Sequence, residues 1–378
     1  IVTDSELISF EGEKVSGLEA VISQVVGSCQ DPVMGKSLES LDAVKKLSVS
    51  AGKVFIDIEL NYPCHSSALP LAKKLHKLLM PLDGVDEAEI DIGHEIKAHA
   101  GQKMLPAMAG VKNIIAVASG KGGVGKSTTT VNLALAMAAE GANVGILDAD
   151  IYGPSQGKML GVAEGVRPQP AGENSFFPIK ALGIQSMSMS YLIEDNTAMV
   201  WRGPMAAGAL QQLVTQTQWD DLDYLFIDMP PGTGDIQLTL SQKVPVSGAV
   251  IVTTPQDIAL LDAKKGIEMF RKVDIPVLGV LENMSTHICS NCGHAEAIFG
   301  EDGGASIAKE YETELLGQLP LALSIRKQAD SGQPTVVAEP ESAYSAVYRD
   351  VALKVAVMLA EKSSQPESII PSISVVDD

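Results

Sequence analysis

The spacing of hydrophobic and polar positions changes near residue 113 and divides the chain into two regions. In the first region, residues 54–60 alternate apolar and polar side chains, which is the period of a half-buried strand. Ala51-Gly52 precedes this strand and is typical of a hairpin turn. The pattern also predicts helices and a further strand, at about 16–27, 66–80 and 86–92. We therefore expect a small α+β domain over residues 1–97.

From Asn113 onward, short apolar runs alternate with helical stretches. Such runs are typical of buried parallel strands that are joined by crossover helices. The sequence predicts these strands at 114–118, 144–147, 224–227, 249–253, 277–281 and 315–319. The fold class that follows is α/β, with a doubly wound, mostly parallel sheet over residues 112–362. Residues 98–111 lose both periodicities and are expected to form a linker, and residues 363–378 a polar tail.

A glycine-rich segment stands between the first of these strands and a helix that is expected at 128–139. Residues 119–127 read Ser-Gly-Lys-Gly-Gly-Val-Gly-Lys-Ser and fit the phosphate-binding pattern G-x-x-x-x-G-K-[ST]. Glycines allow backbone N–H groups to turn toward phosphates at a helix N-terminus. We expect Lys126 to reach the β- and γ-phosphates of ATP and Ser127 to bind Mg²⁺. The predicted nucleotide contacts are Gly120, Gly122, Gly123, Val124, Gly125, Lys126, Ser127 and Thr128.

Acidic residues follow two later strands, and we expect them beside the phosphates. Ligands gather at the carboxyl ends of parallel strands, where these residues stand. Asp228 fits the Walker B role of holding Mg²⁺. Asp148 is expected to support Mg²⁺ or its waters, and Asp150 to orient the attacking water. A solvated acidic loop is the alternative interpretation of Asp148 and Asp150. Together with the phosphate loop, these residues predict an ATP hydrolase.

The four cysteines are too few and too unevenly placed for a disulfide framework. Cys289 and Cys292 form a C-x-x-C pair, and two thiolates at this spacing can chelate one soft metal centre. An identical pair from a second copy would complete a Cys₄ site that suits a [4Fe–4S] cluster. His287 and His294 flank the pair, so zinc within one chain is a competing hypothesis. A thiol pair that binds no metal is the third hypothesis, and the spacing alone does not distinguish among these three.

The charge and hydropathy of the chain limit the classes of binding partner that we expect. A net charge of -19, without a basic stripe, disfavours nucleic acid. No apolar run approaches the roughly 20 residues of a membrane span, and no charged-then-apolar signal segment opens the chain. We therefore expect a cytoplasmic protein without a membrane partner. The same observations count against a positioning or partitioning ATPase, which needs a DNA-binding patch or an amphipathic end.

A second lysine in the phosphate loop, Lys121, resembles the signature of the deviant Walker A ATPases. This group includes the MinD and ParA proteins and the nitrogenase iron protein. In these ATPases the first lysine of the phosphate loop reaches across a dimer interface to the phosphates that the partner binds. The resemblance therefore implies a homodimer in which Lys121 is catalytic. An asparagine contacts the base in related ATPases, which makes Asn283 the candidate here. The nitrogenase iron protein spreads its cluster cysteines through the sequence, whereas the close pair in this chain favours a labile cluster.

The combined motifs are similar to those of the Mrp/ApbC family of iron–sulfur cluster carriers over about residues 108–360. They comprise 120–127, 148–155, 201–205, 228–235 and the 283–293 block that contains the cysteine pair. This resemblance implies that Cys289 and Cys292 of two subunits share a transferable [4Fe–4S] cluster. It also implies ATP hydrolysis coupled to the binding or transfer of the cluster. The expected partners are a cluster-assembly scaffold and apo iron–sulfur acceptor proteins.

The N-terminal region is similar to the PaaD-like or SufT-like domain that precedes the ATPase in many proteins of that family. Asn61-Tyr62-Pro63-Cys64-His65 departs from the Cys-Pro form of that domain, which leaves the role of Cys64 open. The runner-up function is a zinc-stabilised regulatory or positioning ATPase of the MinD/ParA kind.

Overall fold

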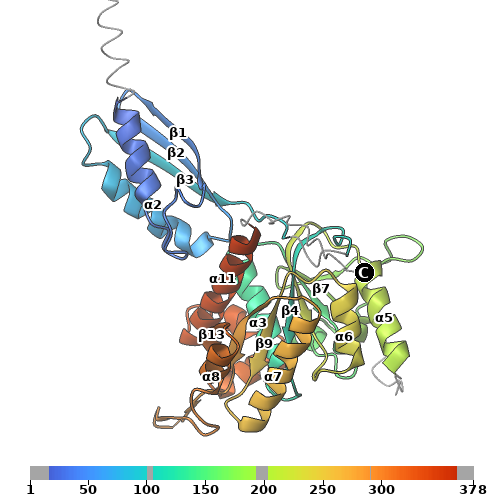
Figure 1. The fold of residues 1–378 in the computed structure, drawn as a ribbon. Coiled ribbons are helices and arrows are strands. Elements are labelled where there is room, and N and C mark those ends of the chain that lie inside the picture. Colours follow the sequence, from blue (N-terminus) through green and yellow to red (C-terminus); the bar gives the residue numbers. More distant parts are fainter. Residues whose placement is uncertain (1–16, 100–104, 193–202, 290, 364–378) are drawn as a thin grey trace, which may run out of the picture.

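The structure is a computed structural model in which two domains lie side by side (Figure 1). It describes residues 17–99, 105–192, 203–289 and 291–363. Residues 201–202 of the tryptophan-containing motif and residues 364–378 of the expected tail lie outside these ranges. No helix within them is both long and apolar enough to cross a membrane.

The small domain packs helices against a three-stranded sheet of order β1-β2-β3. β1 and β2 are antiparallel, while β2 and β3 are parallel. Ala51 and Gly52 both adopt positive φ (48° and 79°), the backbone that a two-residue hairpin turn requires. The elements are a helix at residues 17–28, β1 (Val44–Ser50), β2 (Lys53–Leu60), α2 (His65–Leu79) and β3 (Glu87–His94).

The larger domain is built on an eight-stranded sheet of order β13-β10-β9-β4-β8-β5-β7-β6. Every neighbouring pair is parallel except β6 and β7. The strands are β4 (Val111–Ala118), β5 (Val144–Asp148), β6 (Ile179–Ala181), β7 (Ile184–Ser188), β8 (Leu222–Asp228), β9 (Gly248–Thr253), β10 (Val277–Glu282) and β13 (Glu314–Gln318).

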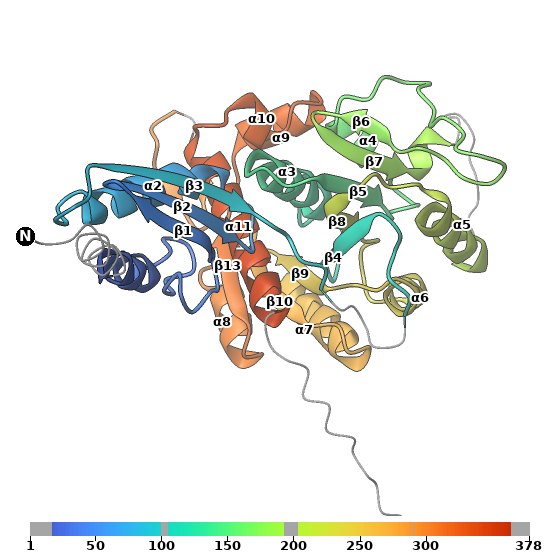
Figure 2. The ribbon, with the colours of Figure 1, turned by 90° about the horizontal axis from the view of Figure 1, so that it is seen from above.

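Helices cover both faces of this sheet (Figures 1 and 2). Ile115 and Val117 of β4 belong to a core that includes side chains of α3 and α11. Ile114 and Ala116 belong to a second core that includes side chains of α5, α6 and α7. This alternation confirms the predicted doubly wound fold. The helices are α3 (Lys126–Ala139), α4 (Gln156–Met159), η1 (Met189–Tyr191), α5 (Gly203–Gln216), α6 (Asp235–Lys243), α7 (Asp257–Lys272), α8 (Gly303–Glu310), α9 (Leu323–Asp330), α10 (Thr335–Ala338) and α11 (Ala343–Ser363).

Two strands of the sheet, β6 and β7, are absent from the sequence-based expectation. All five residues of β7 are buried, but three of them are polar and interrupt the apolar run. Their side chains form hydrogen bonds inside the domain. The Ser186 hydroxyl donates to the Ile179 carbonyl, and the Ser188 hydroxyl donates to the Asp148 carboxylate. Buried polar groups with internal hydrogen bonds are compatible with a core strand, although hydropathy alone does not reveal them.

The order of the strands brings the loops that follow several of them to one edge of the sheet. β4 lies between β8 and β9, and the connections reverse direction here: the connection from β4 leads to β5 on one side, and the connection from β8 leads to β9 on the other, which makes this a switch point. Backbone hydrogen bonds tie the strand ends together, from Met229 N to Val117 O (3.0 Å) and from Ala149 N to Asp228 O (2.9 Å). Gly232 N also donates to Ser119 O (2.9 Å). The segments after β4, β5 and β8 are therefore neighbours.

Glu140, at the C-terminal end of α3, caps helix α2 of the small domain. The residue is 1% exposed, its carboxylate accepts the Ser66 N–H at 2.8 Å, and its carbonyl accepts the His65 N–H at 3.1 Å. The N-cap residue of α2, Cys64, makes no side-chain cap hydrogen bond. Glu140 thus supplies from the other domain the acceptor that a helix N-terminus needs.

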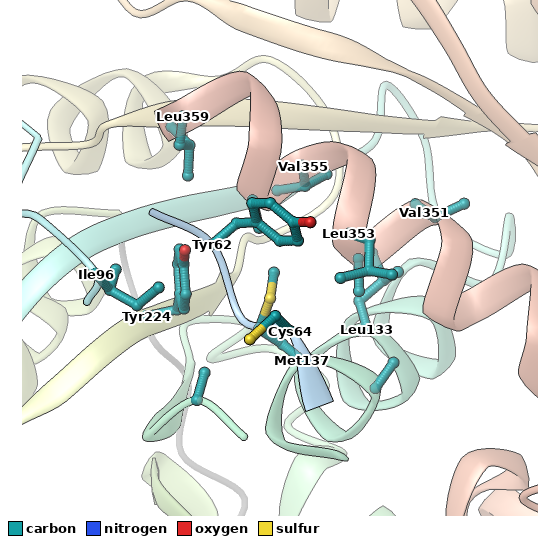
Figure 3. Packing of buried hydrophobic residues seen from close by; sticks show 14 of the residues in the cluster. Tyr62, Cys64, Ile96, Leu133, Met137, Tyr224, Val351, Leu353, Val355 and Leu359 are labelled. Atoms are coloured by element: carbon teal, nitrogen blue, oxygen red, sulfur yellow. The ribbon is translucent and has the colours of Figure 1, made fainter. Parts of the chain in front are cut away.

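An apolar cluster continues across the boundary between the domains. Tyr62 and Cys64 of the small domain lie among Met137 of α3 and Leu353 and Val355 of α11 (Figure 3). All of these side chains are buried. The two domains therefore share one hydrophobic core at this contact, rather than two cores separated by solvent.

We expect Glu140→Ala to lower the free energy of unfolding by about 1–2 kcal/mol, the usual effect of removing a helix cap. Urea denaturation followed by circular dichroism measures the change. Glu310→Ala is the matched control, because Glu310 pairs with Lys264 at 2.7 Å on the surface. Loss of this surface ion pair is expected to lower the free energy of unfolding by less than about 1 kcal/mol. Equal effects of the two substitutions would contradict the capping role of Glu140.

Candidate functional site

The loop between β4 and α3 forms one wall of a pocket of about 230 Å³ at the carboxyl edge of the sheet. Its lining combines the loop with the segments that follow β5 and β8. Among the predicted site residues, the pocket brings together Lys121, Gly122, Gly123, Gly125, Lys126, Ser127, Thr128 and Asp150. Ser119, Ser155, Met159 and Pro231 complete the lining.

Glycines are required in this loop for two separate reasons. Gly123 and Gly125 both adopt φ of 84°, and Gly125 is the N-cap of α3. At Gly120, a Cβ would lie 2.1 Å from the backbone carbonyl carbon of Asp262 in α7. Gly120 therefore serves close packing, whereas Gly123 and Gly125 serve the turn that aims backbone N–H groups into the pocket.

Lys126 is nearly buried and surrounded by carboxylates. Its Nζ lies 2.5 Å from Oδ1 of Asp228 and 3.8 Å from Oδ2 of Asp150, and its side chain is 6% exposed. Nζ also donates to Ser127 Oγ at 3.1 Å. The arrangement holds the ammonium group at the floor of the pocket, where a phosphate group would meet it.

Gln156 and Thr130 complete a network around Asp228 that the sequence did not reveal. The Gln156 amide donates to Asp228 Oδ2 at 2.9 Å and to the Ser127 carbonyl at 3.0 Å. Thr130 Oγ1 donates to the other carboxylate oxygen at 3.1 Å. The only sequence signal is a polar Gln at the start of a short helix after the acidic loop. These bonds fix the orientation of the Asp228 carboxylate.

The oxygen atoms at this site suit a hard divalent cation. Ser127, Asp150 and Ser155 line the pocket, and Asp228 lies directly behind it. Within the described chain, Ser155 Oγ and Gln156 Oε1 are buried without a hydrogen-bond partner. Magnesium prefers such oxygen donors and retains several waters. The residues present therefore fit Mg²⁺.

Asp148 lies behind the acidic loop instead of lining the pocket. It is fully buried and accepts hydrogen bonds from the backbone N–H groups of Asp150, Ser155 and Gln156 and from the Ser188 hydroxyl, at 3.0–3.2 Å. In this position the carboxylate fixes the course of the loop that carries Asp150. Any contact of Asp148 with Mg²⁺ or its waters remains a prediction.

Stability should depend on pH through Asp148. Burial, and then repulsion by Asp228, raises the pKa of Asp148 to about 7. An unfolded carboxyl group titrates near about 4, so the folded protein binds more protons between these values. The contribution of this group to stability is present below about pH 4 and is lost as the pH rises through about 7. We expect the difference in unfolding free energy between the wild-type chain and Asp148→Asn to fall between about pH 4 and 7 and to be constant above this range.

Urea denaturation in the presence of EDTA at several pH values measures this difference. The carboxamide that replaces the Asp148 carboxyl group in the variant does not titrate, so the subtraction removes the contributions of all other groups. Parallel pH profiles for the two proteins would show that Asp148 does not titrate differently on folding.

Asn283 follows β10 and lies against the phosphate loop. Its Nδ2 donates to the Val124 carbonyl at 2.8 Å, and its Oδ1 accepts the Met284 N–H at 2.9 Å. The residue is not part of the pocket lining. Val124 is buried and is also absent from the lining. The predicted contact of Asn283 with the base stays a prediction.

The C-x-x-C pair occupies a hairpin whose strands are β11 (His287–Ile288) and β12 (Ala295–Glu296). Cys289 N donates to the His294 carbonyl, and Gly293 N donates to the Cys289 carbonyl, both at 2.9 Å. Cys289 is partly exposed and Cys292 is exposed. Backbone N–H groups of Asn291 and Cys292, with the Cys292 thiol, hold the pKa of Cys289 below its ordinary value. The hairpin thus favours a thiolate at the surface.

The other two cysteines have the opposite environment. Cys29 and Cys64 are 4% and 2% exposed. Burial raises the pKa of both thiols, and that of Cys64 reaches about 11. In the described ranges, no three His, Cys, Asp or Glu side chains form a group that could hold a metal ion. The flanking histidines therefore do not assemble a Cys₂His₂ set with Cys289 and Cys292 in this structure.

Two family models match the chain. Residues 110–356 match the NUBPL iron-transfer P-loop NTPase family, and residues 19–92 match a family described as iron–sulfur cluster assembly protein. An iron–sulfur cluster carrier protein of Pseudomonas fragi is 64% identical over 279 residues, which are 74% of this chain and 97% of that protein. One of Escherichia coli strain K12 is 50% identical over 349 residues, or 92% of this chain and 94% of that protein.

Solved structures resemble the larger domain. A nucleotide-binding protein from Archaeoglobus fulgidus, in complex with ADP, has 37% sequence identity and a TM-score of 0.54. The match covers 63% of this chain and 92% of that chain. The MinD protein of Pyrococcus horikoshii, complexed with Mg-ADP, has 20% identity and a TM-score of 0.50, with 67% and 99% covered. The second likeness shows the fold alone.

Proposed function

The chain belongs to the NUBPL family of iron-transfer P-loop NTPases, and on that premise we propose that it is an ATP-hydrolysing carrier of iron–sulfur clusters. The proposed cargo is a labile [4Fe–4S] cluster held by Cys289 and Cys292 of two copies of the chain. The cluster is received from an assembly scaffold and passed to apo-protein acceptors. The relatives named as carriers cover most of the chain and support this function.

The observation that carries the proposal is an exposed hairpin with two cysteines in the same domain as a phosphate pocket. The hairpin presents a partly exposed Cys289 and an exposed Cys292 without further side-chain ligands in the described chain. A cluster with four cysteine ligands then requires a second pair, which an identical subunit supplies. Ligands shared across an interface are accessible to an acceptor that competes for them, which suits transfer.

The pocket residues have distinct roles in the proposed hydrolysis. Lys126 and the N–H groups of residues 122–127 bind the phosphates, and Asp150 orients the attacking water. Ser127 and Asp228 would hold Mg²⁺, which supplies charge neutralisation on the phosphate oxygens when it is bound. Lys121 lines the same pocket and, in the proposed homodimer, extends toward the phosphates of the partner. We expect turnover to be slow.

Anaerobic reconstitution with iron and sulfide tests the function. We expect a visible absorption band, about four irons per two chains, and elution as a dimer from a sizing column. One zinc per chain without uptake of iron would overturn the proposal and favour the zinc-stabilised regulatory ATPase. If the iron elutes with a monomer, the carrier function stands, but the proposal that two chains share the cluster site is overturned.

A further inference from the structure

We propose that Asn283 is a positioning residue that connects the phosphate loop to the cysteine hairpin and so links nucleotide binding to the state of the cysteines. This inference rests on the proposed carrier function, and it supplies a physical route between two sites in one domain. It assigns to Asn283 a role in addition to any contact with the base.

The first step of the route is the contact between Asn283 and the phosphate loop. The carboxamide donates to the Val124 carbonyl at 2.8 Å. A Cβ placed on Gly125 would lie only 2.2 Å from the same Nδ2 atom, so the side chain packs directly against the loop backbone. The Asn283 N–H donates to Thr253 O at 2.8 Å, which anchors its backbone on β9. A shift of the loop at Val124 or Gly125 must therefore displace the Asn283 side chain.

The second step leads from Asn283 into the hairpin. Met284 has φ of 56°, a left-handed conformation that non-glycine residues seldom adopt, and its N–H is held by Asn283 Oδ1 at 2.9 Å. The same carboxamide thus contacts the phosphate loop through Nδ2 and holds this kink through Oδ1. The next residue, Ser285, starts the base of the hairpin. Movement of the Asn283 side chain therefore acts on a strained turn that sets the direction of the hairpin.

The third step is the anchoring of the hairpin base. Ser285 donates to Leu319 O through both its N–H (2.9 Å) and its hydroxyl (3.1 Å), and Thr286 O accepts the Leu321 N–H at 2.8 Å. At the returning end, Glu282 accepts the Gly304 N–H at 2.6 Å. Cys289 lies six positions after Asn283 in the chain. Because the anchors at residues 285 and 286 lie between Met284 and Cys289, a change of the kink shifts the anchored base as a unit, and the exposed tip with the cysteines moves with it.

A link of this kind acts in both directions. If a bound nucleotide changes the affinity of the thiols for a ligand by some factor, then that ligand changes the affinity for nucleotide by the same factor. The nucleotide is expected to act through the backbone of the phosphate loop. The N–H groups of this loop bind the phosphates, and its Val124 carbonyl accepts the hydrogen bond from Asn283. The route predicts that removal of the carboxamide uncouples the two sites without removing either.

The rate of thiol modification in the chain with both domains, prepared without iron, tests this inference. Cys29 and Cys64 are buried, so the fast phase of reaction with a soluble aromatic disulfide reports Cys289 and Cys292. In the wild-type chain, saturating ADP or ATP with Mg²⁺ should change the fast rate by about fivefold or more. In Asn283→Ala the change should fall to less than about 1.5-fold, with saturation by nucleotide verified by calorimetry.

Gln218→Ala is the matched control, because it also removes a carboxamide that donates to a backbone carbonyl, that of Ala171 at 3.2 Å, at an exposed position outside the proposed route. It should preserve the nucleotide effect. The inference is overturned if saturated Asn283→Ala shows the full effect, or if nucleotide leaves the wild-type rate unchanged. Iron uptake is measured in a separate experiment. Absence of uptake would overturn the proposed carrier function, whereas the thiol rates test only the link through Asn283.

Discussion

Lys126→Ala is expected to lower the rate of ATP hydrolysis by about 100-fold or more, the usual effect of removing one charged group that stabilises the transition state. Lys126 is the buried cation of the pocket, 2.5 Å from Asp228 and 3.8 Å from Asp150. Without it, the phosphates would face two carboxylates whose charge is no longer neutralised. Phosphate release at saturating ATP measures the rate, and calorimetry measures the affinity.

Lys180→Ala is the control for this substitution, because Lys180 pairs with Asp220 on the surface and both side chains are more than 70% exposed. It removes the same formal charge and should leave turnover within about twofold. Lys126→Met retains most of the buried stem, and its turnover should fall as far as that of Lys126→Ala. Normal hydrolysis in Lys126→Met would show that packing, and not charge, explains the loss.

Cys289→Ala should reduce iron uptake from about four irons per two chains to nearly none, because a cluster with four cysteine ligands loses two of them in the dimer. Iron and sulfide content and the visible spectrum after anaerobic reconstitution measure the effect. Cys292→Ala should behave in the same way. The fold should persist, since Cys289 is partly exposed and Cys292 exposed, and neither belongs to a hydrophobic core.

Cys29→Ala is the matched control for the cysteine substitutions. It also removes one thiol, but Cys29 is 4% exposed and packs in the core of the small domain. Its iron uptake should equal that of the wild-type chain. If Cys289→Ala still binds iron and sulfide normally, the cluster site lies elsewhere in the protein.

The phosphate loop was predictable because its chemistry is local in the sequence. The spacing of Gly120, Gly125, Lys126 and Ser127 reflects the course of a single turn, and the pocket contains the last three. The parallel sheet was predictable for a similar reason, since buried strands are apolar runs. The resemblance to the Mrp/ApbC carriers is confirmed by the family match over residues 110–356.

The contacts that complete the site join residues far apart in the chain. Gln156 meets Asp228 across 72 positions, and Asn283 meets Val124 across 159. Neither pair leaves a periodic signal, because each depends on which strands become neighbours. β7 was missed because the hydrogen bonds of its buried polar residues are visible only in the folded chain. Cys64 is buried where the two domains meet, a contact that the local sequence does not show.

The shared core between the domains determines what happens when the chain is cut between them. An isolated ATPase domain would expose Met137, Leu353 and Val355 to water, together with the unpaired carboxylate of Glu140. Exposed apolar patches of this kind promote self-association. A stand-alone version of this domain therefore needs polar side chains at these positions, and a fragment used for binding studies should carry such substitutions or retain the small domain.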